Sequence, residues 1–354
     1  MPSPEDIAHL RLIRTPRIGP KNFRKLLDEY GSAVAAIEHV PKLAAEAGVK
    51  GFELCAERRI VTELKEGAKL GAHPFFWGRT AYPKLLATAP DAPPFFWALG
   101  NTHLLRKRVL AIVGARNASS LGVRFARSLA AALGDAGFVI ASGLARGIDM
   151  SAHEAALKTG TIAIQAGGLT TAYPPDAKAL HGQIAKDGLL LSEHPFGLHP
   201  QARHFPRRNH ILAGLAEALI VIEGASGSGS LITARAALDL GRDVMAVPGH
   251  PFDGRSTGCN ALLKDGAILV RGPDDVIEAL NTTPHEPEPI TEKTPEQRPI
   301  KARSILSILS STPCAEDSII RDSGMPVHLA TREIATLELE GRVVRDAGGR
   351  ISLA

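Results

Sequence analysis

The chain has few of the residues that disulfide frameworks, redox pairs and thiolate metal sites require. Its 354 residues include 3 cysteines, 2 tryptophans and 3 tyrosines. Cys55, Cys259 and Cys314 are far apart, and their spacing matches no zinc or dithiol motif. The sequence therefore predicts no metal site and no disulfide. Reduced, buried thiols in a cytosolic protein are the simplest interpretation.

Long apolar runs and a strong excess of one charge are also missing. No apolar stretch is long enough to cross a bilayer, and the polar first residues do not resemble a signal peptide. We therefore expect a cytoplasmic protein that does not contact membranes. The formal net charge is +4, and residues 76–280 hold 20 lysines and arginines against 16 aspartates and glutamates. This small excess permits nucleic-acid binding, although on charge alone an ordinary solvated, charge-balanced surface is the preferred interpretation.

Periodicity and composition divide the chain into four parts. Residues 1–75 place apolar side chains at helical spacing and predict a helical domain of the SAM or helix-hairpin-helix type. Its turn at residues 15–21 contains glycine and is followed by cations, so it either docks on a DNA backbone or belongs to a plain helical hairpin. Residues 281–300 are rich in proline and glutamate and predict a linker.

The last part, residues 301–354, shows three helical segments followed by a β-hairpin pattern with a Gly-Gly turn. This order predicts a winged-helix domain. Its third helix carries Arg332 together with Glu333, Glu338 and Glu340. Because residues 301–354 hold seven basic and seven acidic side chains, a protein contact or weak DNA binding fits better than strong groove binding.

The central part, residues 76–280, alternates short β-rich runs with helical patterns. This predicts an α/β fold with a Rossmann-like, doubly wound and mostly parallel sheet. The Pro- and aromatic-rich stretch from Pro74 to Trp97 is interpreted as an extended connector that packs rings onto the core. The expected strands are 109–113, 138–141, 161–164, 189–191, 218–222, 244–247 and 268–270.

A Gly-rich loop after the 218–222 strand is the strongest sign of a binding site. Residues 223–230 read EGASGSGS and precede a helical pattern. Backbone N–H groups in such a turn, at a helix N-terminus, form an anion site. We expect phosphate contacts from Ser228, Gly229, Ser230 and Thr233. The loop lacks the Lys-Ser/Thr end of a P-loop, so ATP hydrolysis is not expected.

Two further segments carry arginines that suit phosphates. After the first core strand, Gly114 allows close backbone approach and Arg116 offers a two-pronged donor, or else caps a neighbouring helix. The spacing is not that of the dinucleotide fingerprint. Arg207, Arg208 and Asn209 precede a helix expected over residues 211–216. Adjacent arginines at a helix start oppose its dipole, which favours an anionic ligand.

The loop after the 138–141 strand offers polar groups to the same edge. Ser142 presents a hydroxyl and Gly143 an amide, and Arg146 follows. Asp149 stands where a helix N-cap is expected, with His153 one turn later. The pair can be interpreted as a general base, but without a nucleophile or metal beside it a cap and a buried polar contact are preferred.

Taken in order, these segments resemble the DNA-processing protein A family (DprA, also called Smf). The resemblance rests on matching stretches over most of residues 105–270: Ile112–Arg116, Ser142–Asp149 with Ala152-His153, Tyr173-Pro174, Leu191–Glu193, Phe205–Asn209 with Ala213–Leu215, Ser228–Ala234, Ala246–Gly249 and Gly266-Ala267. The helical and winged-helix domains also resemble parts found in members of the family.

The resemblance implies a homodimer without enzymatic activity and without a cofactor. It implies single-stranded DNA as a ligand, protection of incoming strands in natural transformation, and help in loading the RecA recombinase. The residues it would place in the strand-binding groove are Arg116, Ser142, Arg146, Arg207, Arg208 and Ser228–Ser230. Two departures stand out. His210 replaces the usual arginine, which predicts a pH-sensitive contact, and residues 165–170 replace a usual Gly-Cys-Gly-Leu-Asp.

The alternative is an enzyme. Lysine-decarboxylase-like phosphoribohydrolases have a related Rossmann-like fold and a Pro-Gly-Gly-x-Gly-Thr-x-x-Glu signature, with the glutamate on the helix after the loop. Here the corresponding helix has no carboxylate before Asp239. Without that acid, hydrolysis lacks a general catalyst. A dinucleotide-dependent oxidoreductase is disfavoured because the fingerprint is absent.

Overall fold

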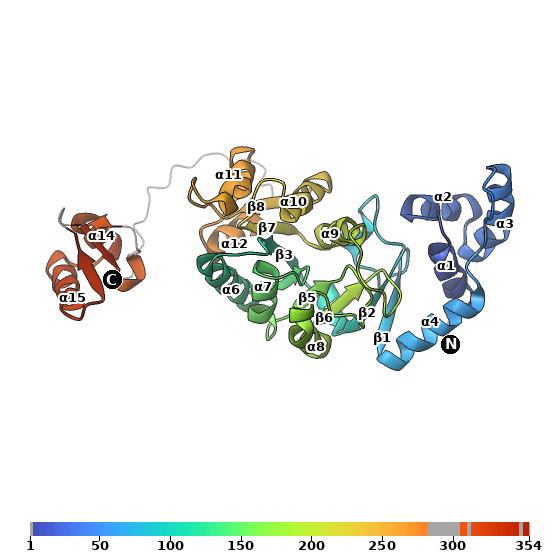
Figure 1. The fold of residues 1–354 in the computed structure, drawn as a ribbon, viewed down its shortest axis with the longest axis horizontal. Coiled ribbons are helices and arrows are strands. Elements are labelled where there is room, and N and C mark those ends of the chain that lie inside the picture. Colours follow the sequence, from blue (N-terminus) through green and yellow to red (C-terminus); the bar gives the residue numbers. More distant parts are fainter. Residues whose placement is uncertain (1–2, 282–304, 310–312, 347–349, 354) are drawn as a thin grey trace, which may run out of the picture. The chain divides into compact units, whose positions relative to one another are not determined.

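The structure is a computed structural model, and it describes residues 3–281, 305–309, 313–346 and 350–353. The chain separates into two compact units, Met1–Pro284 and His285–Ala354, and each is described by itself. The first unit holds both the helical region and the sheet, shown in blue to orange in Figure 1. The predicted boundary at residues 75/76 therefore lies inside one compact unit and stays a prediction.

The N-terminal region is helical, as predicted. Its helices are α1 (Pro4–Arg14), α2 (Pro20–Tyr30), α3 (Ala33–Glu46) and α4 (Glu57–Leu70). Ser3 and Asp6 form a capping box that starts α1, and Gly31, at a φ of +76°, ends α2. Leu12 and Phe23 are fully buried between the first helices, so the periodic apolar residues form a small core of their own.

A nine-stranded sheet forms the centre of the first unit, in the order β1-β2-β6-β5-β4-β3-β7-β8-β9. In this order, the seven strands β6-β5-β4-β3-β7-β8-β9 all pair in parallel, which confirms the Rossmann-like, mostly parallel fold. Their bounds are β3 (Val109–Gly114), β4 (Val139–Ser142), β5 (Thr161–Ile164), β6 (Leu189–Ser192), β7 (Ala218–Ile222), β8 (Asp243–Ala246) and β9 (Ile268–Leu269).

The interpretation of Pro74 to Trp97 as a connector was wrong, although its rings do pack onto the core: Phe95, Phe96 and Trp97 are each 1% exposed. This stretch contains the last three residues of β1 (Ala72–Phe76) and the first three of β2 (Phe95–Gly100). The two strands pair antiparallel and extend the sheet beyond β6. Phe75 and Phe96 stack across the two strands with ring centroids 5.0 Å apart. Such cross-strand aromatic pairs stabilise an edge, and β1 tolerates Pro74 because it is the edge strand.

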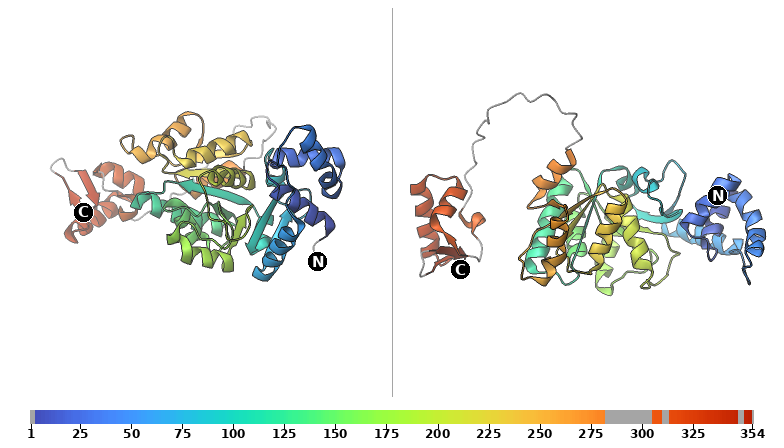
Figure 2. Two further views of the ribbon diagram at one scale, coloured as in Figure 1. Left: turned by 45° about the vertical axis from the view of Figure 1, so that its right-hand side comes forward. Right: turned by 90° about the horizontal axis from the view of Figure 1, so that it is seen from above.

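Helices cover both faces of the sheet, as the two views of Figure 2 show. Alternate residues of β3 point to opposite sides: Leu110 and Ile112 pack with one helical layer, and Ala111 and Val113 with the other. The first layer contains α6 (Ser120–Asp135), α7 (Ile148–Ala156) and α12 (Pro273–Asn281). The second contains α5 (Lys84–Ala87), α9 (His204–Leu215), α10 (Gly229–Asp239) and α11 (Thr257–Lys264), while α8 (Lys178–Asp187) covers β2, β5 and β6.

The second unit is a winged helix, as predicted. It contains α13 (Ile305–Ile308), β10 (Cys314–Ala315), α14 (Glu316–Ser323), α15 (Val327–Leu339), β11 (Val343–Arg345) and β12 (Arg350–Leu353). The three strands form a sheet in the order β10-β12-β11. The predicted Gly-Gly turn and the predicted linker, apart from residue 281, lie outside the described residues. No helix among the described residues is long and apolar enough to span a membrane.

Candidate nucleic-acid interface

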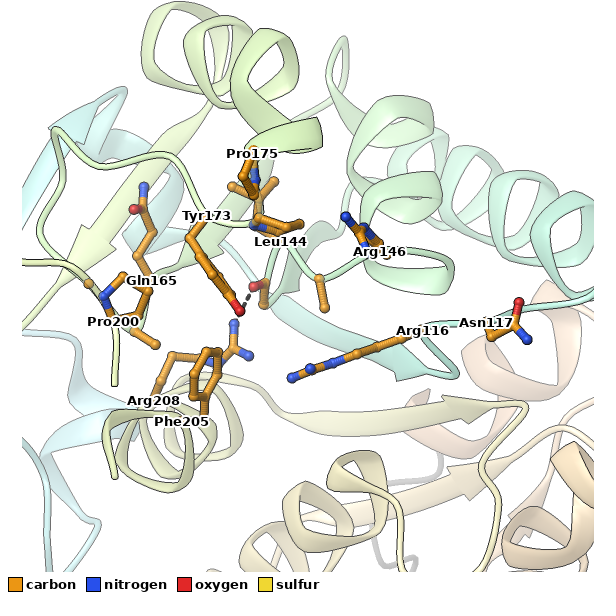
Figure 3. Close-up of a pocket in the computed structure, with 15 residues that line it drawn as sticks. Arg116, Asn117, Leu144, Arg146, Gln165, Tyr173, Pro175, Pro200, Phe205 and Arg208 are labelled. Carbon is orange, nitrogen blue, oxygen red and sulfur yellow. Dashed lines mark hydrogen bonds between the residues drawn. The ribbon is translucent and has the colours of Figure 1, made fainter. Parts of the chain in front are cut away.

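Loops at the carboxyl edge of the sheet enclose two adjoining cavities of about 440 and 420 Å³. The cavities share six lining residues and form one continuous depression, here called the central groove. The shared residues are Arg116, Asn117, Gly143, Ala145, Phe205 and Arg208. They come from the loops after β3 and β4 and from α9, and Figure 3 shows Arg116 extending toward Phe205 and Arg208. Ligands of open α/β sheets bind at this edge.

Arg116 stands at the centre of the groove. A Cβ at Gly114 would overlap the carbonyl oxygen of Ile222, so glycine lets β3 and β7 approach closely just before the arginine. The Arg116 side chain is exposed, and its guanidinium carbon lies 5.6 Å from the centroid of the Phe205 ring. Within the described residues it has no carboxylate partner, so its charge is available to a ligand. It does not cap a neighbouring helix.

The Gly-rich loop forms the wall opposite Arg116. Gly227, at a φ of +78°, turns the chain so that Ser228 becomes the N-cap of α10. The hydroxyls of Ser228 and Ser230 are 2.8 Å apart, and the Thr233 hydroxyl donates to the carbonyl oxygen of Gly229 over 3.2 Å. The first N–H groups of a helix have no intrahelical acceptor, so this wall favours an anion. All four predicted residues of this loop line the groove.

Arg146 lies at the outer rim of the groove. Its Nε is 2.6 Å from Oδ2 of Asp176, and both side chains are more than half exposed. An exposed ion pair of this kind contributes little to folding stability, so Arg146 can leave Asp176 and bind a ligand phosphate instead. Arg146 is therefore accessible, although its charge is partly compensated.

Ser142 does not line the groove, which corrects the prediction of a phosphate contact from its hydroxyl. The side chain is fully buried and donates to the carbonyl oxygen of Ile112 over 2.6 Å. It joins β4 to β3 beneath the groove. Sequence reasoning placed Ser142 at the strand end correctly, but a strand residue can point into the core as well as into the site.

Arg208 supports the groove floor from within. It is 7% exposed, and Nη1 donates to the carbonyl oxygens of Gly143 and Ile164, the latter over 3.0 Å. A Cβ at Gly143 would overlap this guanidinium, so glycine is required there. Arg208 therefore has a structural role, and the direct phosphate contact stays a prediction. The buried charge still adds to the positive potential of the groove.

Asp149 is not the N-cap of α7, because Gly147 occupies that position. Its carboxylate instead accepts from the backbone N–H groups of Gly143 (3.1 Å) and Ala145 (3.3 Å) and fixes the loop after β4. Burial raises the pKa of Asp149, and the Arg208 charge opposes this shift. His153 contacts the hydroxyl of Thr161 at 2.6 Å, and burial lowers its pKa to about 3. The two residues therefore have separate structural partners.

The helix that carries the paired arginines begins at His204, seven residues before its predicted start. Asn209 faces the central groove, where its Nδ2 is 3.5 Å from the carbonyl oxygen of Gly229. Arg207 projects to a different side of α9 and does not line the central groove. The expected single surface for all three segments is therefore confirmed for Arg116 and the serines, but not for Arg207.

Arg207 lines a separate cavity of about 360 Å³, here called the hairpin cavity. This cavity lies between α9 and the turn at Gly19–Asn22 that starts α2. Arg207 Nη2 is 2.6 Å from Oε2 of Glu193, whose pKa is raised by burial. His210 lies beside it, with Nδ1 3.1 Å from Oδ2 of Asp91, and this contact raises the pKa of His210.

Three contributors to the site were not assigned a role from the sequence. Tyr173 and Phe205 line the groove with ring centroids 5.8 Å apart, and Figure 3 shows both rings. Each stood within a quoted motif, but nothing local showed that the rings face the same space. Glu223 accepts from the backbone N–H of Ser119 at 2.8 Å and from its hydroxyl, which ties the loop after β7 to α6.

The described residues include no cluster of three or more histidines, cysteines, aspartates or glutamates arranged to hold a metal ion. Cys55 and Cys259 are buried thiols. The groove is therefore characterised by exposed or buried arginines, helix N-terminal amides, hydroxyls and two aromatic rings. This combination suits a phosphate-containing ligand with flat, apolar parts.

Family models match almost the whole chain. A model of the DNA recombination-mediator protein A family matches residues 73–281. A DprA-like N-terminal HHH domain matches residues 3–65, and a DprA winged helix domain matches residues 284–349.

Curated proteins and solved structures agree with these models. Protein Smf of Escherichia coli is 37% identical over 280 residues, which cover 77% of this chain and 74% of the relative. DNA processing protein DprA of Streptococcus pneumoniae is 44% identical over 198 residues, which cover 55% of this chain and 70% of the relative. The crystal structure of that protein matches with a TM-score of 0.64 at 36% identity over 78% of this chain and 98% of the other. DNA processing protein A of Helicobacter pylori, whose structure concerns its single-stranded DNA binding mode, matches with a TM-score of 0.55 at 29% identity. The match covers 59% of this chain and 95% of the other.

Proposed function

We propose that this chain, which belongs to the DNA recombination-mediator protein A (DprA/Smf) family, binds single-stranded DNA in the central groove without cleaving it. One observation carries the proposal: Arg116 and the serines at the start of α10 face the same open groove from different loops. A cation and a helix N-terminus that converge in this way bind phosphate. The Helicobacter pylori relative, described by its single-stranded DNA binding mode, supports the choice of ligand.

The groove chemistry fits a single strand better than a duplex. Phosphate contacts from Arg116, Arg146 and the amides of the Ser228–Ser230 turn would hold the backbone. The Tyr173 and Phe205 rings would contact bases, since every base offers a flat face to an aromatic ring. A duplex hides these faces in its stack. We therefore expect little sequence preference and strong salt dependence.

The biological role that we propose follows the family. The chain would protect incoming strands in natural transformation, help to load the RecA recombinase, and act as a cytoplasmic homodimer. The DprA names of the Streptococcus pneumoniae and Bacillus subtilis relatives support a DNA-processing role. Size-exclusion chromatography with light scattering tests the dimer, and strand-exchange assays with and without this protein test RecA loading.

The rival, a nucleotide-cleaving phosphoribohydrolase, needs a carboxylate at the start of the helix after the Gly-rich loop. In α10 the first carboxylate is Asp239, which is the last residue of the helix and lies about 15 Å along it from the N-terminus. Asp149, which does line the groove, is committed to two backbone N–H groups. Release of ribose phosphate from nucleoside monophosphates would support the rival.

A salt series gives the most direct test. We would titrate the full chain with a fluorescent oligothymidylate of about 20 nucleotides at salt concentrations from about 50 to 200 mM. The logarithm of affinity should fall linearly with the logarithm of salt, by about 0.7 for each phosphate neutralised. A duplex of the same length is the matched control and should bind more weakly. An affinity that does not change across this range would rule out the phosphate groove.

A further inference from the structure

We propose that Phe252, on the loop that follows β8, is a stacking platform for a nucleobase of the strand held in the central groove. The inference rests on the proposed function and extends it to a residue outside the groove. Phe252 is 95% exposed, more than any other large apolar side chain among the described residues. A phenyl ring in water lacks the favourable free energy that burial would provide, so a fully exposed ring indicates a binding role.

The loop that carries Phe252 is firmly held. Asn260 clamps its start: Nδ2 donates to the carbonyl oxygen of Gly249 over 2.9 Å, and Oδ1 accepts from the Gly249 N–H over 3.2 Å. Asp253 and Arg255 form a two-pronged ion pair with both N···O distances at 3.0 Å. The ring of Phe252 also lies 5.6 Å from that of His250. A loop fixed on both sides of Phe252 holds the backbone from which the exposed ring projects.

The same loop continues the edge of the sheet that carries the central groove. In the sheet, β8 lies next to β7, whose following loop binds the proposed phosphate. The two loops are joined directly: Ser226 N–H donates to the Thr257 hydroxyl over 3.0 Å, and Gly258 N–H donates to the carbonyl oxygen of Gly224 over 2.7 Å. Arg255 lines the central groove itself.

This arrangement favours a nucleobase as the occupant. Neighbouring strands are about 4.8 Å apart, so the loops that follow β7 and β8 begin side by side. A strand that crosses the edge would pass Tyr173 after β5, Arg116 after β3 and Ser228 after β7, and would reach Phe252 after β8. An exposed aromatic side chain would thus stand at each end of a row of phosphate contacts, as in other single-strand binding sites.

The test uses the full-length protein and two probes of about 20 nucleotides: oligothymidylate and an abasic strand of the same length, which keeps the phosphates and lacks the bases. Phe252→Ala should weaken oligothymidylate binding by about fivefold to tenfold and leave the affinity for the abasic strand unchanged. Phe252→Leu keeps apolar bulk without a flat face and should show the same loss. Phe252→Trp should bind as the unchanged protein does, with tryptophan fluorescence quenched on binding.

Leu238→Ala is the matched control, because Leu238 is 55% exposed, lies near the C-terminal end of α10 and does not line the central groove. This variant should bind both probes normally. The inference is overturned if all Phe252 variants bind oligothymidylate equally, if both probes lose affinity together, or if the variants change the molecular mass in solution, which would make Phe252 a contact to a second copy. Failure of the proposed function looks different, because the unchanged protein would then bind neither probe.

Discussion

The guanidinium carbon of Arg116 lies 5.6 Å from the centroid of the Phe205 ring, and this pair joins the loop after β3 to α9 across the central groove. The contact holds the arginine over an aromatic face and adds no opposing charge. Arg116 is thus positioned before a ligand arrives, while its N–H donors stay free for phosphate. Arg146 and Arg207, in contrast, are each paired with a carboxylate at 2.6 Å.

Arg116→Ala should therefore weaken single-stranded DNA binding more than loss of Arg146 or Arg207. We expect a loss of about tenfold or more, equal for all sequences, because the contact is to the backbone. The salt slope should become shallower by about 0.7, the value for one phosphate on a single strand. Fluorescence anisotropy over a salt series measures both quantities.

Arg124→Ala is the control for loss of charge alone, since Arg124 is exposed on α6 and does not line the central groove. It should change affinity by less than about twofold, as expected for a distant and screened charge. If Arg116→Ala reduced binding on some sequences only, Arg116 would contact bases and the backbone model would be incorrect.

Loss of Arg208 should destabilise the fold more than loss of its neighbour Arg207. Arg208→Leu removes a buried guanidinium and leaves the carbonyl oxygens of Gly143 and Ile164 and the charge of Asp149 unmatched. Breaking such a buried pair costs about 3–5 kcal/mol, so urea unfolding should show a large loss of stability. Arg207→Leu removes a half-exposed side chain but leaves the buried carboxylate of Glu193 without this partner, so it should cost less, about 1–3 kcal/mol. Equal losses would contradict the distinct positions of the two side chains.

Much of the fold was predictable because its patterns are local. Short β-branched runs between helices indicated the parallel sheet, and helical spacing indicated both terminal domains. The strands β1 and β2 were missed because Pro74, Pro93 and Pro94 mask a strand pattern, and only antiparallel pairing with each other and with β6 shows it. At an edge, tertiary pairing overrides such local signals.

The site was predictable only in part, for a geometric reason. Sequence places a residue at a strand end, but it does not give the direction of the side chain. Gly114, Arg208 and the serines of α10 therefore line the groove as expected, whereas Ser142 points inward and Arg207 faces the hairpin cavity. A one-residue difference along α9 turns a side chain by about 100°, which separates Arg207 from Arg208.

A buried polar network joins the N-terminal helices to the sheet, and its loss should destabilise the first unit. Arg14 Nη2 is 2.7 Å from Oε1 of Glu63, and the same oxygen accepts from Nε1 of the buried Trp97 at 2.9 Å. Glu63→Ala would leave both donors without their acceptor and should cost about 3 kcal/mol or more. Urea unfolding, followed by tryptophan fluorescence, measures this change. Glu57→Ala, which breaks an exposed pair with Arg11, is the control and should be almost neutral.

The pair of His210 and Asp91 should make stability depend on pH near neutrality. The hydrogen bond to Asp91 raises the pKa of His210, and the same bond lowers the pKa of Asp91. For a raised histidine pKa, the stabilisation is fully present below the unfolded value of about 6.5 and is lost as pH rises through the folded pKa. For the lowered aspartate pKa, it is present above about 3.9 and is lost in more acidic solution. The pair should therefore stabilise most near pH 5 to 6.

We expect a contribution of less than about 1 kcal/mol, because His210 is 40% exposed and solvent screens the pair. The measurement compares urea unfolding at about pH 5.5 and pH 8. His210→Arg keeps a positive charge at both pH values and should remove this part of the pH dependence, and it should also strengthen binding of single strands at pH 8 if the DNA extends to the hairpin cavity. Identical pH profiles for His210→Arg and the unchanged chain would show that the pair does not titrate as its geometry requires.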